Sequence, residues 1–255
     1  MAHAIEFQNV TKTFRGSSRN AVDRINFTAE EGEFITILGS SGCGKTTLLK
    51  MINRLYEPDA GKIILFGEDI ASLDPVKLRR RIGYVIQQIG LFPHITVGGN
   101  IAMVPALLKW EKEKTDSRVD QLLTMAGLVP EEYKNRYPAQ LSGGQQQRVG
   151  LARALAADPK IMLMDEPFGA IDSITRARLQ QELLTLHRGM KKTFLFVTHD
   201  IEEAFTLGTR VMIMNEGHIL QFGTPEQIIL HPADGFVASL VEAARAKEQF
   251  WEKFK

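Results

Sequence analysis

The chain has 255 residues, of which 44% are hydrophobic and 24% are charged, and its formal net charge is +1. This composition is ordinary for a globular protein with a hydrophobic core, built as one α/β domain with an appendage or as two small lobes. The balanced charge gives no extended electrostatic surface for nucleic acid or an anionic membrane.

The chain contains one cysteine, which excludes an internal disulfide and favours a reducing compartment. Its first ten residues lack the basic start and apolar core of a secretory signal. The longest weakly polar stretch, 95–108, falls short of the ~20 apolar residues that a membrane-spanning helix needs. We therefore expect a soluble protein, for which any membrane role must come through a partner.

Short β-branched runs alternate with amphipathic stretches, a pattern typical of a mainly parallel sheet covered by helices. Residues 5–7 and 25–29 alternate apolar with polar side chains, as half-buried antiparallel strands do. Residues 34–38 are continuously apolar and then meet glycine, which predicts a buried central strand. Further apolar runs predict strands at 63–66, 84–86, 161–164, 194–197 and 211–214.

The strand pattern disappears between residues 92 and 157, which predicts an all-helical insertion in the α/β core. Helical spacing covers 96–110, 115–126 and 143–157, interrupted by Pro105, Pro130 and Pro138. Helix starts are also predicted at Asp74, which precedes a proline, and at Asp200, which precedes Glu203 by three residues.

The pattern of the last segment, 236–255, predicts an amphipathic helix that follows a larger domain of residues 1–235. Its apolar side chains share one stripe, made of Phe236, Leu240, Val241, Ala244, Trp251 and Phe254. We expect this stripe to pack on its own domain, with a partner site as the alternative.

The segment from Gly39 to Thr47 fits the phosphate-binding P-loop, because an apolar strand precedes it and a helical pattern follows it. Glycines let backbone N–H groups curl around phosphate oxygens, and the helix N-terminus adds partial positive charge. Lys45 would bridge the β- and γ-phosphates of ATP, and the Thr46 hydroxyl would hold Mg²⁺. The predicted nucleotide contacts of the loop are Gly39, Ser40, Ser41, Gly42, Cys43, Gly44, Lys45, Thr46 and Thr47.

The only thiol, that of Cys43, belongs to this loop. Inward-pointing N–H groups, Lys45 and a helix N-terminus favour a reactive thiolate. We therefore expect maleimide to label Cys43 and inactivate the protein, and bound MgATP to slow the labelling.

Two adjacent carboxylates, Asp165 and Glu166, follow the apolar strand at 161–164. Such a pair is costly after buried residues unless a cation or a reaction uses it, although a strand end that turns into solvent also commonly carries Asp and Glu. In a chain with a P-loop, Asp165 is the expected Mg²⁺ ligand, directly or through water. Glu166 is then the expected general base that polarises the attacking water.

His199 follows the strand predicted at 194–197, at the sheet edge where doubly wound folds bind their ligands. We assign it to the γ-phosphate or the attacking water. The other five histidines show no ligand spacing, so we expect no zinc site.

The segment from Leu141 to Gln145 places a serine hydroxyl and backbone N–H groups at the start of a predicted helix, which makes a second candidate anion site. It resembles the signature motif of the ATP-binding-cassette (ABC) family. In that family two cassettes pair head to tail, and each ATP lies between one chain's P-loop and the other's signature. The resemblance implies nucleotide contacts at Ser142, Gly143, Gly144 and Gln145.

Three further positions match the family in its usual order along the chain. Phe14 matches the aromatic residue that stacks on adenine. Gln87 matches the glutamine that touches Mg²⁺ and the attacking water and senses the membrane subunits. Asp172 matches the acidic residue that communicates across the dimer, and Ile171 stands where leucine is usual.

The resemblance covers nearly the whole chain and implies an α/β fold: a P-loop NTPase core with a mainly parallel sheet, an N-terminal antiparallel β subdomain and the helical insertion. It implies an ATPase that uses ATP and Mg²⁺ and works as a homodimer, or with a paralogous cassette. The implied partners are integral membrane permease subunits and, through them, an extracytoplasmic solute-binding protein. The implied location is peripheral, at the cytoplasmic face of the cell membrane.

The segments 88–94 and 166–170 are similar to those of bacterial uptake cassettes, and the coupling surface is expected at 91–103. Segments 51–58, 82–94 and 104–110 resemble cassettes for glycine betaine, carnitine and choline, which implies a quaternary-amine osmoprotectant as cargo. Many of those cassettes continue into a pair of cystathionine-synthase-type regulatory domains, whereas this sequence ends at Lys255, so we expect no salt sensing through such a tail. The alternatives are a sulfonate, nitrate or amino-acid importer, and a non-transport ABC ATPase of DNA repair or translation.

Overall fold

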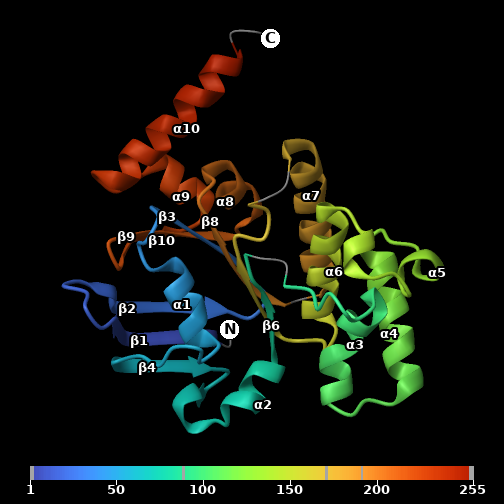
Figure 1. Cartoon of the computed structure of the whole chain (residues 1–255). Helices are drawn as coiled ribbons and strands as arrows, with labels where there is room; N and C mark the ends of the chain where they lie inside the picture. Colours follow the sequence, from blue (N-terminus) through green and yellow to red (C-terminus); the bar gives the residue numbers. More distant parts are fainter. Residues whose placement is uncertain (1–2, 88–89, 170–171, 191, 253–255) are drawn as a thin grey trace. The chain divides into compact units, whose positions relative to one another are not determined.

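The computed structural model describes residues 3–87, 90–169, 172–190 and 192–252, with side chains to residue 246. The chain folds as two compact units, one of Met1–Leu73 with Thr193–Lys255 and one of Asp74–Lys192 (Figure 1). Each unit combines β-strands with helices, so both have the α/β character that the sequence predicts.

The first unit opens with an antiparallel sheet in the order β2-β1-β4-β5. Its strands are β1 (His3–Thr13), β2 (Asn20–Glu30), β4 (Ala60–Leu65) and β5 (Glu68–Asp69). Phe7 pairs with Phe27 across β1 and β2, and their rings stack with centroids 4.6 Å apart. The prediction of half-buried antiparallel strands near residues 5 and 25 is confirmed, and both strands extend further than the alternating pattern indicates.

The same unit holds four strands of a second sheet, in the order β10-β9-β3-β8. They are β3 (Phe34–Gly39), β8 (Thr193–Thr198), β9 (Arg210–Asn215) and β10 (His218–Gly223). β3 lies parallel to both β8 and β9, and every residue of β3 and β8 is buried, as their apolar runs predict. The sequence pattern does not predict β10, because its antiparallel edge position leaves it half exposed and it lacks a clean apolar run.

Four α-helices and one 3₁₀-helix complete the first unit: α1 (Lys45–Ile52), η1 (Ile70–Ser72), α8 (Ile201–Leu207), α9 (Pro225–Leu230) and α10 (Phe236–Glu252). Val237 and Val241 of α10 pack into a buried cluster with Leu38 of β3 and side chains of β9, α8 and α9, and Phe236 and Leu240 pack against this cluster. The prediction that the stripe of α10 packs on its own domain is confirmed for these residues. The side chain of Trp251 and the whole of Phe254 lie outside the described residues.

In the second unit β6 (Ile82–Val85) pairs with β7 (Ile161–Asp165) in parallel, and the other elements among its described residues are helices. Its helices are α2 (Pro75–Arg80), α3 (Val97–Leu107), α4 (Lys112–Met125), α5 (Pro130–Tyr133), η2 (Pro138–Gln140), α6 (Gly143–Leu155) and α7 (Ser173–Met190). No strand occurs from 92 to 157, as predicted. The cap of α2 is also confirmed, because the Asp74 carboxylate accepts the Lys77 N–H at 2.8 Å.

Two details of the helical prediction are wrong. Pro105 does not interrupt its helix but lies inside the last turn of α3, which continues to Leu107. α4 begins at Lys112, three residues before the predicted start, and the Thr115 hydroxyl donates to Glu111 O at 3.0 Å within its first turn. Pro105 is buried, so packing of α3 outweighs the local signal there, whereas the added first residues of α4, Lys112 to Lys114, are exposed.

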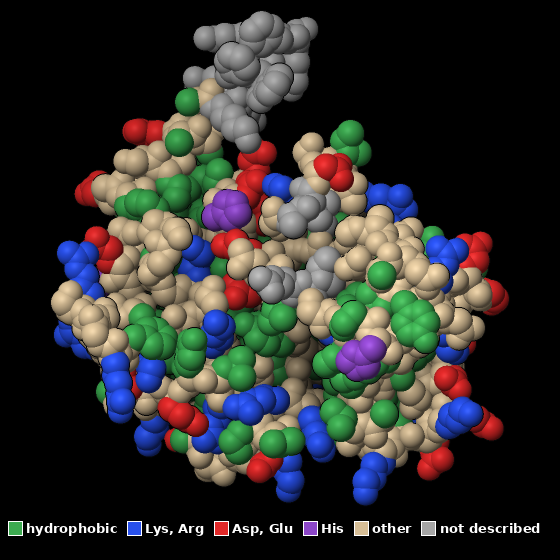
Figure 2. All heavy atoms as spheres, in the orientation of Figure 1, with side chains coloured by type: hydrophobic (Ala, Val, Ile, Leu, Met, Phe, Trp, Pro, Cys, Tyr) green, Lys and Arg blue, Asp and Glu red, His purple; other side chains and the backbone are tan. Residues whose placement is uncertain are grey.

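Among the described residues, no helix is both long enough and apolar enough to cross a membrane. Acidic and basic side chains both occur on the face of the molecule shown in Figure 2, in keeping with the formal net charge of +1.

Candidate functional site

The phosphate loop of the first unit runs from the end of β3 into α1. Lys45, the first residue of α1, is buried, and its Nζ donates to Gly39 O at 2.8 Å and to Ser40 O at 2.9 Å. Carbonyls of the loop itself therefore hold the ammonium group over the loop. A phosphate oxygen bound at the loop could replace one of these carbonyls as the acceptor of a hydrogen bond from Lys45 Nζ.

The N-terminus of α1 has no side-chain cap, because the N-cap residue is Gly44. Gly44 has φ of 106°, and a Cβ there would lie 2.2 Å from Ala21 O, so a larger residue fits neither the backbone conformation nor the space. Ser40, Ser41 and Gly42 are exposed, which leaves the outer side of the loop accessible. An uncapped helix N-terminus beneath an open glycine-rich loop fits a phosphate group.

The side chain of Cys43 points away from this open face. It is only 2% exposed, and its Sγ lies 3.9 Å from Lys45 Nζ. The expectation of a thiol that maleimide labels readily is therefore wrong for the folded chain, because thiolate chemistry needs access as well as nearby positive charge. The backbone of Cys43 belongs to the phosphate loop, and its side chain belongs to the core.

Phe14 and His199 also belong to the first unit, and both are exposed. The ring of Phe14 makes an edge contact with Tyr56 at 5.1 Å between centroids, and Lys12 Nζ lies 5.9 Å from it. His199 follows β8, between Thr198 and the N-cap of α8, Asp200. An exposed aromatic face and an imidazole at a strand end are consistent with the predicted roles of these residues at adenine and at the γ-phosphate.

Asp200 caps α8 as predicted, since its carboxylate accepts the N–H groups of Glu202 and Glu203. The buried carboxylate of Glu203 accepts a short hydrogen bond from the Thr198 hydroxyl, and that hydroxyl oxygen accepts the Asp200 N–H. This arrangement steadies the backbone on both sides of His199. The sequence offers no signal for it beyond the spacing of a helix start.

In the second unit, Asp165 ends β7 and is 6% exposed, and Glu166 follows it with φ of 45°. Such a conformation is uncommon for a residue with a Cβ and costs free energy, of order 1–3 kcal/mol. Gln87, which comes shortly after β6, donates from Nε2 to Glu166 Oε2 at 3.1 Å. The structure thus brings together two predicted catalytic side chains that lie 79 positions apart in the sequence.

The hard oxygen donors predicted for Mg²⁺ fit that ion. The Asp165 carboxylate and the Gln87 amide oxygen belong to the second unit, and the half-buried Thr46 hydroxyl belongs to the first, and their binding of one ion stays a prediction. No group of three or more His, Cys, Asp or Glu side chains that could hold a metal occurs among the described residues. Mg²⁺ at a nucleotide takes only one or two protein oxygens and otherwise keeps water and phosphate ligands, so such a cage is not required.

The signature segment opens α6 with a reciprocal cap. Ser142 Oγ accepts the Gln145 N–H at 3.4 Å, and Gln145 Oε1 accepts the Ser142 N–H at 2.9 Å. Gln145 also donates from Nε2 to the Tyr133 hydroxyl at 3.0 Å, so its side chain is engaged within the unit. The exposed Ser142 hydroxyl retains its proton to donate, and a Cβ on Gly143 would meet nothing within 4 Å. The helix start is therefore open to an anion, and its binding role stays a prediction.

Asp172 is exposed at the start of α7, and its carboxylate accepts the Thr175 N–H at 3.0 Å. The hydrogen bonds from the backbone and side chain of Thr175 hold the pKa of Asp172 below its ordinary value. The carboxylate is therefore charged at neutral pH and available at the surface. Ile171, the predicted departure from the family, lies with Ala170 outside the described residues, as do Gln88 and Ile89.

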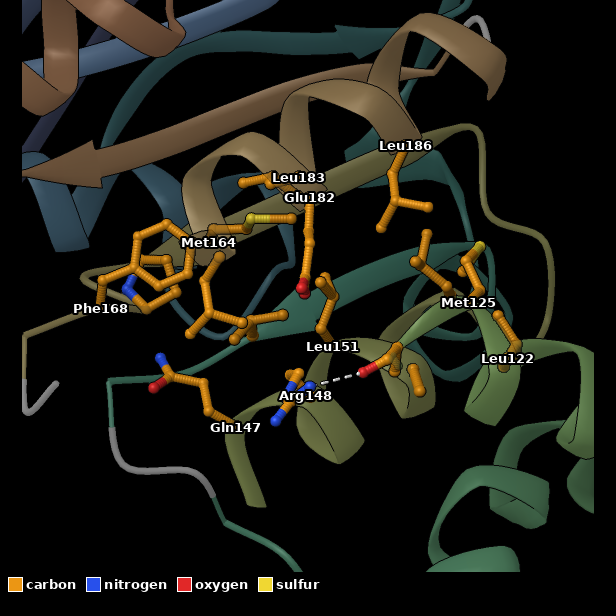
Figure 3. Close-up of a pocket in the computed structure, with 16 residues that line it drawn as sticks. Leu122, Met125, Gln147, Arg148, Leu151, Met164, Phe168, Glu182, Leu183 and Leu186 are labelled. Atoms are coloured by element: carbon orange, nitrogen blue, oxygen red, sulfur yellow. Dashed lines mark hydrogen bonds between the residues drawn. The ribbon is translucent and has the colours of Figure 1, made fainter. Parts of the chain in front are cut away.

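A cavity in the second unit borders the Asp165-Glu166 pair, since Met164 and Pro167 are among the residues that line it (Figure 3). Its walls are mostly apolar and come from α4, α6, α7 and the segment after β7, including Phe168 and Leu183. Arg148 projects into it and donates to Ala126 O at 3.1 Å. With a volume of about 30 Å³, it is far too small for a nucleotide.

Comparison with known proteins identifies the family. The ABC transporter family model matches residues 22–169, which include the phosphate loop, the signature segment and the Asp165-Glu166 pair. The chain belongs to the ABC transporter family. This assignment rests on the match to the family sequence model and does not depend on the geometry of the site.

Several relatives are about half identical to the chain. The choline transport ATP-binding protein OpuBA of Bacillus subtilis (strain 168) is 53% identical over 241 residues, which cover 94% of this chain and 63% of that protein. The carnitine transport ATP-binding protein OpuCA of Listeria monocytogenes serotype 1/2a (strain 10403S) is 52% identical over 96% of this chain and 61% of that protein. The glycine betaine uptake system ATP-binding protein YehX of Escherichia coli (strain K12) is 52% identical, with coverages of 91% and 75%. The chain thus spans less than two thirds of the length of the first two relatives.

Solved ABC cassettes share the fold. A dimeric post-hydrolysis state of an ATP-binding cassette, bound to ADP and Pi, matches with a TM-score of 0.78 and 37% identity over 87% of this chain and 98% of that one. The protein cbiO1 of Clostridium perfringens, part of the ABC transporter complex cbiONQ, matches with a TM-score of 0.83 and 26% identity over 91% and 92%. The prediction of an α/β P-loop NTPase fold is confirmed.

Proposed function

We propose that this chain is the ATP-hydrolysing subunit of an ABC importer that takes up a quaternary-amine osmoprotectant such as glycine betaine, carnitine or choline. The observation that carries the motor function is the phosphate loop, with Lys45 held over an open glycine-rich turn at an uncapped helix start. The cargo rests on relatives of 52–53% identity, whose names state choline, carnitine or glycine betaine transport.

Each predicted site residue has a role in this proposal. Lys45 and the N–H groups of the loop bind the phosphates, and Phe14 stacks on adenine. Thr46 and Asp165 hold Mg²⁺, which neutralises phosphate charge when bound. Glu166 accepts a proton from the attacking water, Gln87 orients that carboxylate through its hydrogen bond, and His199 contacts the γ-phosphate.

The active form in this proposal is a head-to-tail dimer with a second cassette, identical or paralogous. The exposed Ser142 hydroxyl and the N–H groups at the start of α6 would bind the γ-phosphate of the ATP held by the partner. Asp172 would communicate across the same interface. The dimeric state of the solved cassette bound to ADP and Pi supports this arrangement.

The partners in this proposal are integral permease subunits and, through them, an extracytoplasmic solute-binding protein. The chain would then be peripheral at the cytoplasmic face of the membrane. The helical segment 92–157, with the surface at 91–103, would receive movements of the permease. Phe92, Leu107 and Leu108 are exposed apolar side chains of this segment, which suits a surface that a partner covers.

Reconstitution tests the cargo. The chain is assembled in proteoliposomes with its permease and binding protein, and ATPase activity is measured with a panel of solutes. We expect stimulation by betaine, carnitine or choline and none by taurine, nitrate, amino acids or spermidine. Spermidine belongs in the panel because a spermidine/putrescine import ATP-binding protein of Lawsonia intracellularis (strain PHE/MN1-00) is 45% identical to the chain. Stimulation by one of the latter solutes alone would contradict the proposed cargo and leave the motor function intact.

A further inference from the structure

The hairpin turn between β9 and β10 reaches the phosphate loop from a distant part of the sequence. The turn is formed by Glu216 and Gly217, with φ of 45° and 83°. Two consecutive residues with positive φ are typical of a tight two-residue hairpin turn, whose geometry is well defined. The residue that opens the turn is Asn215, the last of β9.

Three hydrogen bonds tie this turn to its surroundings. Ser40 Oγ donates to Asn215 Oδ1 at 2.8 Å, and the Gly217 N–H donates to Cys43 O at 3.1 Å. Gly217 O in turn accepts the N–H of Asp23 in β2 at 2.9 Å. The turn is therefore anchored to the first sheet on one side and holds two residues of the phosphate loop on the other.

The space around the turn is narrow. A Cβ on Gly217 would lie 2.9 Å from Asn20 O, in addition to the unfavourable φ. The loop residue Gly44 approaches the next residue of β2 in the same way, since a Cβ on Gly44 would lie 2.2 Å from Ala21 O. The loop thus packs closely against β2, and the turn contacts both of them.

Ser40 connects the turn to the phosphate-binding lysine. Ser40 O accepts hydrogen bonds from Lys45 Nζ at 2.9 Å and from the Cys43 N–H at 3.3 Å, while its hydroxyl donates to Asn215. The hydroxyl proton of Ser40 is therefore committed to Asn215 rather than to a phosphate oxygen.

We infer that Asn215 is a positioning residue for ATP: it touches no reacting atom, and it sets the orientation of Ser40 and hence of the loop that binds the phosphates. This inference rests on the proposed function as an ATPase, because it presupposes that the loop binds ATP. According to this inference, the affinity for ATP depends on the Asn215 side chain, which lies 175 positions from Ser40 in the sequence.

The test is a double-mutant cycle between Asn215 and Ser40, read out as the affinity for MgATP in competition with a fluorescent ATP analogue. The variants are Asn215→Ala, Ser40→Ala and the combination of both. We expect each single variant to weaken binding about three- to tenfold, as the loss of one hydrogen bond does, and the combination to be no weaker than either alone. In steady-state kinetics, KM for ATP should rise while kcat stays within about twofold, because the reacting groups are untouched.

Asn26→Ala is the matched control. Asn26 is an exposed strand asparagine whose Oδ1 accepts the Asn9 N–H at 2.8 Å, in the β1–β2 sheet. This variant should bind ATP as the unchanged chain does. Thermal unfolding of all variants separates general destabilisation from a specific loss of affinity.

Two outcomes would overturn the inference. In one, Asn215→Ala lowers the melting temperature but leaves ATP affinity unchanged, which assigns it a structural role only. In the other, the effects of the two single variants multiply in the double variant, which shows that Asn215 does not act through Ser40. Failure of the unchanged chain to bind ATP would instead contradict the proposed function, so the two failures are distinguishable.

Discussion

The substitution Glu166→Gln removes one proton acceptor and changes almost nothing else. Glutamine has the same length and shape, and its amide oxygen can still accept the hydrogen bond that Gln87 Nε2 gives to Glu166 at 3.1 Å. The phosphate loop lies in the other unit of the chain and is not altered. We therefore expect the fold and the affinity for ATP to persist.

Hydrolysis should fall by roughly 10²–10⁴-fold, the usual contribution of a general base. At about 1.4 kcal/mol for each factor of ten, this corresponds to about 3–6 kcal/mol of lost transition-state stabilisation. The φ of 45° at Glu166 is shared by Glu216 in a hairpin turn, so the assignment of Glu166 as the base rests on its place directly after β7 and on the hydrogen bond from Gln87.

The assay is phosphate release under saturating MgATP, with gel filtration to detect a dimer trapped by unhydrolysed ATP. The matched control is Glu182→Gln, the same change at a partly buried glutamate of α7 that pairs with Arg178 at 3.0 Å. Loss of the Glu182–Arg178 ion pair should lower the free energy of unfolding by no more than about 0.5 kcal/mol, and turnover should stay unchanged. Undiminished turnover in Glu166→Gln, or an equal loss in Glu182→Gln, would refute the assignment of Glu166 as the base.

Three further outcomes follow from burial and hydrogen bonding. Maleimide should label Cys43 slowly in the folded chain and rapidly in urea, because its side chain is 2% exposed; rapid labelling of the folded chain would contradict this burial. Asn100→Ala should lower the free energy of unfolding in urea by about 2–3 kcal/mol, because Asn100 is fully buried and makes hydrogen bonds to Phe92 N, Phe92 O, Ile95 O and Thr96 O; a change below about 1 kcal/mol would contradict it. Lys192 Nζ, 2.7 Å from the Asp158 carboxylate, holds the pKa of that carboxyl below its ordinary value of 3.8, so the pair should stabilise the fold fully above about pH 5 and lose this effect as pH falls through the lowered pKa. Acid unfolding of Asp158→Asn should lack this component, and an unchanged acid transition would argue against the pair.

Properties that depend on neighbours in sequence could be predicted from the sequence. The buried strands β7 and β8 follow from unbroken apolar runs, and β3 from a run that only Thr36 interrupts, because a strand covered on both faces needs no polar alternation. The starts of α2, α6 and α8 follow from capping side chains that bond N–H groups two or three residues ahead. The phosphate loop belongs to the same class, since strand, glycine-rich loop and helix are contiguous.

Weakly patterned elements needed the tertiary structure. α7 spans 18 residues, yet its buried residues are only Leu179 and Leu183, so its apolar stripe is too sparse to be read from the sequence. Pro105, which the pattern predicts to interrupt a helix, lies within one, because it is buried and the packing of α3 offsets the one backbone hydrogen bond that proline removes. Propensity is a weak signal where packing decides the outcome.

The sequence by itself determined which residues are candidates for binding and catalysis, because residue type and spacing specify the chemistry that each side chain can perform. Only the tertiary structure decided the direction in which each side chain points and the residue that holds it. The Cys43 thiol turns into the core, Gln87 reaches Glu166, and Asn215 holds Ser40. The last two contacts join residues 79 and 175 positions apart, and no local pattern encodes them, since strand order and register bring such side chains together only when the sheet is complete.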